Sequence, residues 1–139
     1  MISTVFARGF SLEVAHRLEN VPDGHKCKRL HGHTYRVTIE VSGEVDPELG
    51  WVIDYFEIAE AWRTRVYEKL DHRNLNDELP ELSGNTTSEN LAYWIQGEIL
   101  DALGAKVNGR RGSLEGSGQL CVIVEAWETE HCGARAEFR

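Results

Sequence analysis

The sequence predicts an α+β fold in which two helices pack on one face of an antiparallel sheet. Two segments near the N-terminus and two near the C-terminus alternate between apolar and polar residues, as half-buried strands do. Between them, two segments repeat apolar residues at helical spacing. Hairpins on either side of a pair of helices are typical of a four-stranded antiparallel sheet with both helices on one side. Because the chain has 139 residues, we expect a single domain over 1–139.

The first half of the chain predicts a strand, a loop, a second strand and a helix. These elements are expected at 10–14, 19–30, 33–43 and 55–70. The start of the helix is marked by Asp54 and Glu57, which have the spacing of a capping box.

The second half predicts a helix, a loop and two strands. They are expected at 87–103, 104–119, 120–128 and 134–138. Thr86 and Glu89 repeat the capping-box spacing at the start of the helix. The 104–119 segment is rich in Gly and Ser, which favours a loop.

The composition excludes several classes of partner. The chain has 23 acidic and 15 basic residues, a formal charge of −8, whereas nucleic acids and membrane surfaces attract basic faces. No apolar stretch approaches the roughly 20 residues that span a bilayer, and the N-terminus shows no secretory signal. The three cysteines have no disulfide spacing, so we expect a cytoplasmic protein with reduced thiols.

Three histidines continue the apolar faces of the first two strands. Residues two apart on a strand share a face, so His31 and His33 lie on the side of Tyr35, and His16 lies on the side of Val14. If these strands pair as a hairpin, the three imidazoles meet at one end of the buried face. Three neutral imidazoles can bind zinc and leave a fourth position open for water or substrate.

Two alternatives to this open metal site remain. Each histidine taken singly is explained as an ordinary polar residue at a strand end. Cys27 lies close to His31 in sequence and is either a fourth ligand of a closed structural site or a reactive thiolate beside an open one.

Three further residues have both a chemical and a structural explanation. Glu128 continues the apolar face of the third strand, where a carboxylate can accept two hydrogen bonds from a planar donor pair or simply be solvated. Asp71 can orient His72 as a proton carrier, or His72 can favour the end of the first helix through its positive charge. Thr87 and Glu89 are explained by the start of the second helix.

Six motifs together resemble a known family. They are AHRL at 15–18, CKRLHGH at 27–33, GWVIDY at 50–55, LDHRNLND at 70–77, TSENLA at 87–92 and WET at 127–129. In this order they resemble the 6-pyruvoyl-tetrahydropterin synthase superfamily and, within it, the bacterial 6-carboxy-tetrahydropterin synthases of queuosine biosynthesis. The three residues between Cys27 and His31 resemble the queuosine enzymes, whereas the pyruvoyl synthases usually have a longer gap.

The resemblance implies a fold, an assembly and residue roles. It implies a tunnelling fold whose subunits form trimeric barrels, with two trimers stacked as a homohexamer and active sites between subunits. It implies one Zn²⁺ per subunit held by His16, His31 and His33, and Cys27 as the catalytic base. Asp71 and His72 match its relay partners, which a neighbouring subunit can supply. Glu128 matches the carboxylate that anchors the pterin ring and has sometimes been given a relay role; Thr87 and Glu89 match residues near the pterin pocket.

The implied reaction converts 7,8-dihydroneopterin triphosphate to 6-carboxy-5,6,7,8-tetrahydropterin with release of acetaldehyde and triphosphate. The alternatives are a pyruvoyl synthase, which eliminates triphosphate without carbon–carbon cleavage, and a non-catalytic zinc protein with a His3Cys site. Three features depart from the family pattern: Thr86 stands where Pro is common, the 104–119 loop is long, and the chain ends in AEF rather than Tyr.

Overall fold

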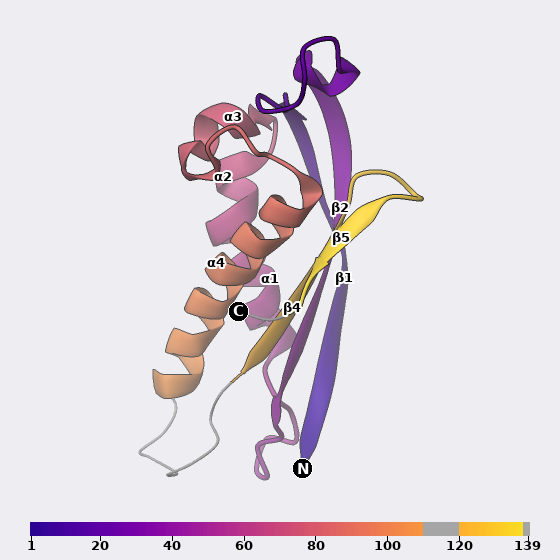
Figure 1. The fold of residues 1–139 in the computed structure, drawn as a ribbon. Helices are drawn as coiled ribbons and strands as arrows, with labels where there is room; N and C mark the ends of the chain where they lie inside the picture. Colours follow the sequence, from indigo (N-terminus) through magenta and orange to yellow (C-terminus); the bar gives the residue numbers. More distant parts are fainter. Residues whose placement is uncertain (110–119, 138–139) are drawn as a thin grey trace.

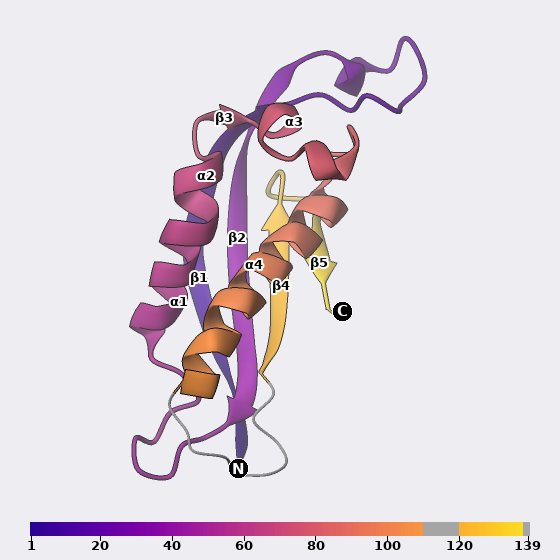
Figure 2. The same ribbon diagram turned by 90° about the vertical axis from the view of Figure 1, so that its left-hand side faces the viewer.

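The protein consists of a twisted five-stranded sheet with helices on one side. We describe residues 1–109 and 120–137 of a computed structural model. Figure 1 shows α1, α2 and α4 on one side of the sheet, and Figure 2 shows α1 and α4 lying across β1, β2 and β4. The strands are β1 (Ile2–His16), β2 (His31–Glu44), β3 (Arg73–Asn74), β4 (Cys121–Trp127) and β5 (Gly133–Ala136).

The strand order in the sheet is β3-β1-β2-β4-β5. The four predicted strands are present, and β1, β2, β4 and β5 pair antiparallel in succession. The predicted count of four is short by one, because β3 pairs in parallel with the end of β1. This strand has two residues, which is too short to show an alternating pattern in the sequence.

The helix predicted at 55–70 begins and ends where expected. It consists of α1 (Tyr55–Trp62), a π-helical turn (Arg63–Tyr67) and α2 (Glu68–Leu70). Asp54 caps its start, because the Asp54 carboxylate accepts a hydrogen bond from the Phe56 N–H at 2.9 Å. The short helix α3 (Leu75–Glu78) and a 3₁₀ turn (Pro80–Leu82) then lead to the second long helix.

The second long helix, α4 (Ser88–Gly109), differs from its prediction at both ends. The residue that caps it is Thr87, whose hydroxyl accepts a hydrogen bond from the Asn90 N–H at 3.3 Å. The predicted capping role of Thr86 is wrong, because this side chain is buried and turns to other partners. The helix also includes 104–109 of the predicted loop; the rest of that loop, 110–119, lies outside the described residues, as does Phe138 of the predicted last strand.

A bulge at Gly9 decides which side chains of β1 face the helices. Ala7 pairs with Ile39 but Phe10 pairs with Val37, so three steps along β1 match two along β2. Gly9 takes a φ of 88°, a conformation that glycine adopts without a Cβ penalty. After the bulge the even-numbered residues of β1 face inward, which places His16 on the buried side.

The core lies between the inner face of the sheet and the helices. Alternate residues of β2 and β4 are buried, and so are residues along one face of α4. Gln96 is a polar side chain inside this core, and its amide donates to the Val122 carbonyl at 2.7 Å. Within the described residues, no helix is both long enough and apolar enough to cross a membrane.

The bulge generates a stability prediction. We expect Gly9→Ala to lower the free energy of unfolding by about 1 kcal/mol, because an L side chain at this positive φ is strained. Gly104→Ala is the matched control. It lies within α4 with open space around the added methyl, so it should raise stability by roughly 0.5–1 kcal/mol. Urea unfolding of both variants tests this, and equal shifts for the two would contradict the role given to Gly9.

Candidate functional site

Three histidines meet at the end of the β1–β2 hairpin. His16 pairs directly with His31, and His33 pairs with Val14, so all three side chains leave the same face of the sheet. Their ring centroids lie 4.7 Å (His16–His31), 5.1 Å (His16–His33) and 4.8 Å (His31–His33) apart. One ligand atom from each ring lies within 4.8 Å of the others, as a site for one metal ion requires. The predicted cluster is therefore present.

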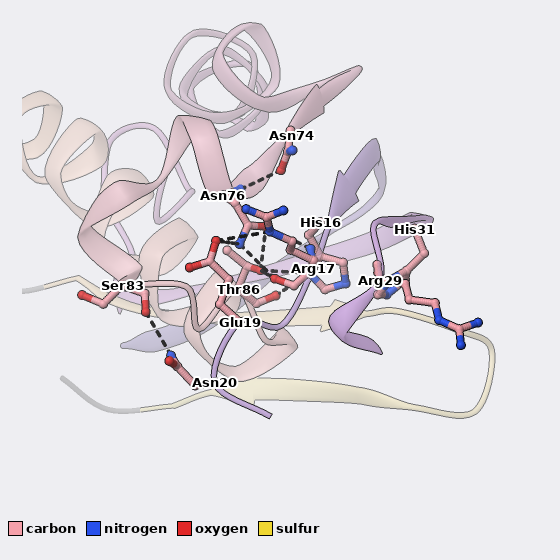
Figure 3. A network of polar contacts seen from close by, with 10 residues as sticks. All are labelled: His16, Arg17, Glu19, Asn20, Arg29, His31, Asn74, Asn76, Ser83 and Thr86. Atoms are coloured by element: carbon pink, nitrogen blue, oxygen red, sulfur yellow. Dashed lines mark hydrogen bonds and ion pairs between the residues drawn. The ribbon is translucent and has the colours of Figure 1, made fainter. Parts of the chain in front are cut away.

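The hydrogen bonds of the rings leave nitrogen atoms for a metal. His16 Nδ1–H donates to the Thr86 carbonyl at 2.8 Å, with the Thr86 hydroxyl at 3.1 Å, as Figure 3 shows. His31 Nδ1–H donates to the Arg29 carbonyl at 2.6 Å. Both rings then present an Nε2 lone pair, the usual arrangement of metal-ligating histidines.

His33 supplies a further sign that the group fits a metal. Its Nε2 is buried and has no hydrogen-bond partner. Glu128 Oε1 lies 3.3 Å away, but the two groups are not aligned for a hydrogen bond. An unsatisfied buried nitrogen is costly unless something binds it. Three imidazoles suit a borderline-soft divalent ion such as Zn²⁺.

Burial holds two of these histidines in the form that binds metals. Burial lowers the pKa of His16 and outweighs the hydrogen bond to Thr86, which acts in the other direction. Burial also lowers the pKa of His33, although the nearby Glu128 carboxylate opposes it. Both rings are therefore neutral at neutral pH without any ion present, and neutral imidazole is the ligating form.

A cavity of about 250 Å³ opens beside the histidines. Cys27 lines it together with His16 and His31, so the predicted thiol and metal ligands share one site. The structure also brings Glu128 to this cavity, together with Thr87 and Glu89 from the start of α4. Cys132, which the sequence did not single out, lies in its wall as well.

The Glu128 carboxylate is held from two sides. The buried Tyr35 hydroxyl donates to Glu128 Oε2 at 3.2 Å, and the Ser88 hydroxyl lies 3.4 Å from the same oxygen. Burial raises the pKa of Tyr35, so its hydroxyl remains a hydrogen-bond donor. The tight turn after β4 holds the backbone, because the Glu128 N–H donates to the Cys132 carbonyl at 2.9 Å.

Tyr35 and Thr86 are the functional contacts that the sequence did not predict. Tyr35 is the one residue with a polar tip on the otherwise aliphatic inner face of β2, and a buried hydroxyl needs a partner. That signal was available but did not say which partner. Thr86 has capping-box spacing, and only the fold shows that it contacts His16 instead.

Asp71 and His72 form a pair at the end of α2. His72 Nδ1 lies 2.7 Å from Asp71 Oδ2, and Asp71 Oδ1 accepts a hydrogen bond from the Glu13 N–H at 3.0 Å. Burial acts to raise the pKa of Asp71, but hydrogen bonds from Glu13, His72 and Tyr67 outweigh it and lower the pKa. The predicted orientation of His72 by a carboxylate is thus present.

This pair does not face Cys27 within one chain. His72 is 78% exposed and lines a second cavity of about 500 Å³ with Glu13 and Thr34. Glu13 and Thr34 have the opposite strand parity to the three histidines and bond to each other at 2.7 Å. The Asp71–His72 pair therefore lies against the other face of the hairpin.

Comparison with known proteins identifies the family. The family model described as 6-pyruvoyl tetrahydropterin synthase matches residues 5–138. The chain belongs to this family. The chain of the Caenorhabditis elegans 6-pyruvoyl tetrahydropterin synthase superposes with a TM-score of 0.77 at 25% identity, covering 100% of this chain and 97% of that one. The tunnelling fold is therefore confirmed for the single chain, while the barrel assembly stays a prediction.

Curated relatives carry two different names. A 6-pyruvoyl tetrahydrobiopterin synthase of Dictyostelium discoideum is 37% identical over 79 residues, which is 56% of this chain and 58% of that protein. A dihydroneopterin monophosphate aldolase of Pyrococcus furiosus is 35% identical over 98 residues, which is 70% of this chain and 80% of that protein. The matches span only 58% and 50% of the Dictyostelium and Drosophila melanogaster synthases. Family membership alone thus leaves the reaction open.

The lowered pKa values generate a pH prediction for the metal-free family member. We expect its free energy of unfolding to fall as the pH drops below about 6.5, the ordinary histidine value. The unfolded chain binds protons there that buried His16 and His33 exclude, so protonation favours unfolding. Urea unfolding at a series of pH values measures the slope. The His16→Gln/His33→Gln double variant should show a shallower slope between about pH 7.5 and 5.5, and an unchanged slope would contradict this origin.

Proposed function

We propose that this chain is a zinc-dependent lyase that converts 7,8-dihydroneopterin triphosphate to 6-carboxy-5,6,7,8-tetrahydropterin. The observation that carries the proposal is one cavity that joins a thiol (Cys27), two metal-binding imidazoles (His16 and His31) and an oriented carboxylate (Glu128). The spacing of Cys27 and His31 supports the 6-carboxy product and a place in queuosine biosynthesis, because it resembles the enzymes of that pathway.

The carboxylate of Glu128 is proposed to anchor the pterin ring. A pterin presents adjacent N–H donors on one edge, and a carboxylate can accept both. Tyr35 and Ser88 contact Oε2 of Glu128 and so limit its rotation. Thr87 and Glu89 lie on the same cavity wall and are proposed to contact the rest of the ring. A fixed ring places the side chain of the substrate toward the histidines.

Cys27 is proposed to remove a proton from the substrate side chain. A 3₁₀ turn (Lys26–Lys28) positions it, in which the Cys27 N–H donates to His25 Nδ1 at 3.1 Å. The backbone of the turn is tied to the end of β1, because the Leu18 N–H donates to the Cys27 carbonyl at 2.8 Å. A zinc ion held by His16, His31 and His33 supplies Lewis-acid polarisation of side-chain oxygens, which makes the adjacent C–H more acidic.

The reaction balances with one added water. The C–O bond to triphosphate and one side-chain carbon–carbon bond break, and water supplies the second carboxylate oxygen. Two carbons leave as acetaldehyde, and the electrons from the side chain reduce the dihydropterin ring to the tetrahydro level. No external oxidant or reductant is needed, which agrees with a site that contains only a thiol, imidazoles and carboxylates.

A second copy of the chain is proposed to complete the site. The proton that Cys27 takes must be passed on, and the Asp71–His72 pair is suited to that because Asp71 orients the ring. Within one chain this pair lies on the other face of the hairpin, so it is proposed to serve the Cys27 of a neighbour. A homohexamer built as a dimer of trimers, as in the resemblance, provides such contacts.

Two other reactions are favoured by the names of relatives. Pyruvoyl synthases eliminate triphosphate and keep all side-chain carbons, and several curated relatives are named 6-pyruvoyl tetrahydrobiopterin synthase. The Pyrococcus relative is named as an aldolase of a monophosphate. All three reactions need the same ring anchor, so the products distinguish them.

The product profile tests the proposed reaction. We expect purified zinc-loaded protein to convert 7,8-dihydroneopterin triphosphate to the 6-carboxy product with one acetaldehyde per turnover, measured by chromatography and an aldehyde assay. The monophosphate is the matched control substrate and should react far more slowly. A pyruvoyl product without acetaldehyde would contradict the proposal, and so would preferential turnover of the monophosphate to a hydroxymethyl pterin.

Mixed assemblies test the shared site. We expect Cys27→Ala and Asp71→Asn each to bind zinc normally and to be inactive alone, because neither residue is a metal ligand. Co-expression in equal amounts should restore about a quarter of wild-type activity, since each site draws its thiol and its relay pair from different copies. No recovery from two folded, zinc-loaded variants would place the site within one chain. Loss of zinc in Cys27→Ala would instead favour the closed His3Cys site.

A further inference from the structure

Asn76 connects the end of β1 to the segment before α4. It lies in the second position of α3, directly after a turn in which Asn74 Oδ1 accepts a hydrogen bond from the Asn76 N–H at 3.0 Å. Its half-buried side chain reaches the residue that follows His16, as Figure 3 shows. The proposed roles above leave this asparagine without a function.

The Asn76 amide holds the backbone of Arg17 in both directions. Asn76 Oδ1 accepts a hydrogen bond from the Arg17 N–H at 3.0 Å, and Asn76 Nδ2 donates to the Arg17 carbonyl at 2.9 Å. A side-chain amide provides a donor and an acceptor side by side, which neither a carboxylate nor a hydroxyl does in this geometry. The peptide next to His16 is therefore fixed as it is fixed inside a sheet, although the pairing of β1 with β2 ends at His16.

The same amide lies beside the hydrogen-bond partner of the metal ligand. Thr86 Oγ1 is 3.4 Å from Asn76 Oδ1 and 3.4 Å from the Arg17 carbonyl, and both of these can accept its proton. With its hydrogen directed there, the Thr86 hydroxyl offers a lone pair to His16 Nδ1–H at 3.1 Å. The Thr86 carbonyl at 2.8 Å completes the pair of acceptors. Two acceptors at Nδ1 keep the proton on that nitrogen and leave Nε2 for the metal.

We propose that Asn76 is a positioning residue for His16, which holds this ligand ready for the metal from outside the coordination sphere. The inference rests on the metal site of the proposed function, but not on its reaction. It adds a residue that acts through two contacts of His16: the following peptide and the Thr86 hydroxyl. Because His16 is 1% exposed, its ring cannot find water as a substitute partner when these contacts are lost.

Zinc affinity of paired asparagine variants tests the inference. We expect Asn76→Ala to weaken zinc binding about tenfold, the lower end of the range for groups that contact a ligand directly, because Asn76 acts one residue further away. Asn20→Ala is the matched control. Asn20 Nδ2 also donates to a backbone carbonyl and a side-chain oxygen, of Ser83 and Asn85, at 3.0 and 2.7 Å. Within the described residues, the recorded bonds of Asn20 do not reach His16, Arg17 or Thr86, so its variant should bind zinc within about twofold of wild type.

Competition with a chelator gives the zinc dissociation constants, and the visible spectrum of the Co²⁺-loaded protein reports the ligand geometry. We expect the Co²⁺ bands to shift in Asn76→Ala and not in Asn20→Ala. Where Asn76→Ala does not fold, Asn76→Asp, which keeps an acceptor for Arg17 but has no N–H to donate, is compared with Asn20→Asp. Equal zinc affinity and an unchanged spectrum in a folded Asn76 variant would overturn the positioning role alone.

A second set of results separates this inference from the proposed function. If wild-type protein binds no zinc, the metal site fails and the inference fails with it. If the wild type binds one equivalent and both asparagine variants weaken it equally, the effect is general destabilisation and the positioning role is overturned. If the wild type binds zinc and shows the predicted difference but makes another product, the inference stands and only the proposed reaction is wrong.

Discussion

The register of the β1–β2 hairpin is the constraint on which the site depends. A shift of one residue in β1 would turn every side chain of that strand to the opposite face and would move His16 from the core to the other side of the sheet. The bulge at Gly9 sets the parity, and the pairing of His16 with His31 ends the ladder at the required residue. Because apolar residues of both strands are buried on the same face, the energy of the core also enforces the geometry of the histidines.

The site lies where this apolar face ends, and its electrostatics follow from that position. The core excludes water from His16 and His33, which lowers their pKa values and keeps them neutral. The same burial keeps Tyr35 protonated, so that it can orient Glu128. The formal charge of −8 does not exclude an anionic substrate, because a bound divalent cation supplies positive charge where it is needed and many of the carboxylates lie on exposed surfaces.

A short chain accommodates this chemistry by using both faces of one hairpin. Cys27 and the histidines open to one cavity, while the Asp71–His72 pair opens to another. The two halves are each well ordered by local contacts: the 3₁₀ turn for Cys27, and the parallel strand β3 and the Glu13 N–H for the pair. A fold of this size then needs a second copy to bring the halves together, which connects assembly with activity in the proposed mechanism.

The sequence by itself determined the elements that depend on local patterns. The α+β class, the long helix after Asp54 and the common face of His16, His31 and His33 all follow from periodicity and capping. The six motifs also identified the family, which the family model confirms. These features depend on residues a few positions apart, so one chain read in order contains the required information.

Only the tertiary structure decided which distant groups meet. The two-residue strand β3, the contact of Thr86 with His16, the clamp of Asn76 on Arg17 and the bond from Tyr35 to Glu128 join residues far apart in sequence. Thr86 shows the reason: its local spacing fits a helix cap, but burial beside His16 offers its hydroxyl a stronger requirement. The separation of Cys27 from Asp71 and His72 is likewise a property of strand pairing, because parity assigns a face only once the partners of each strand are known.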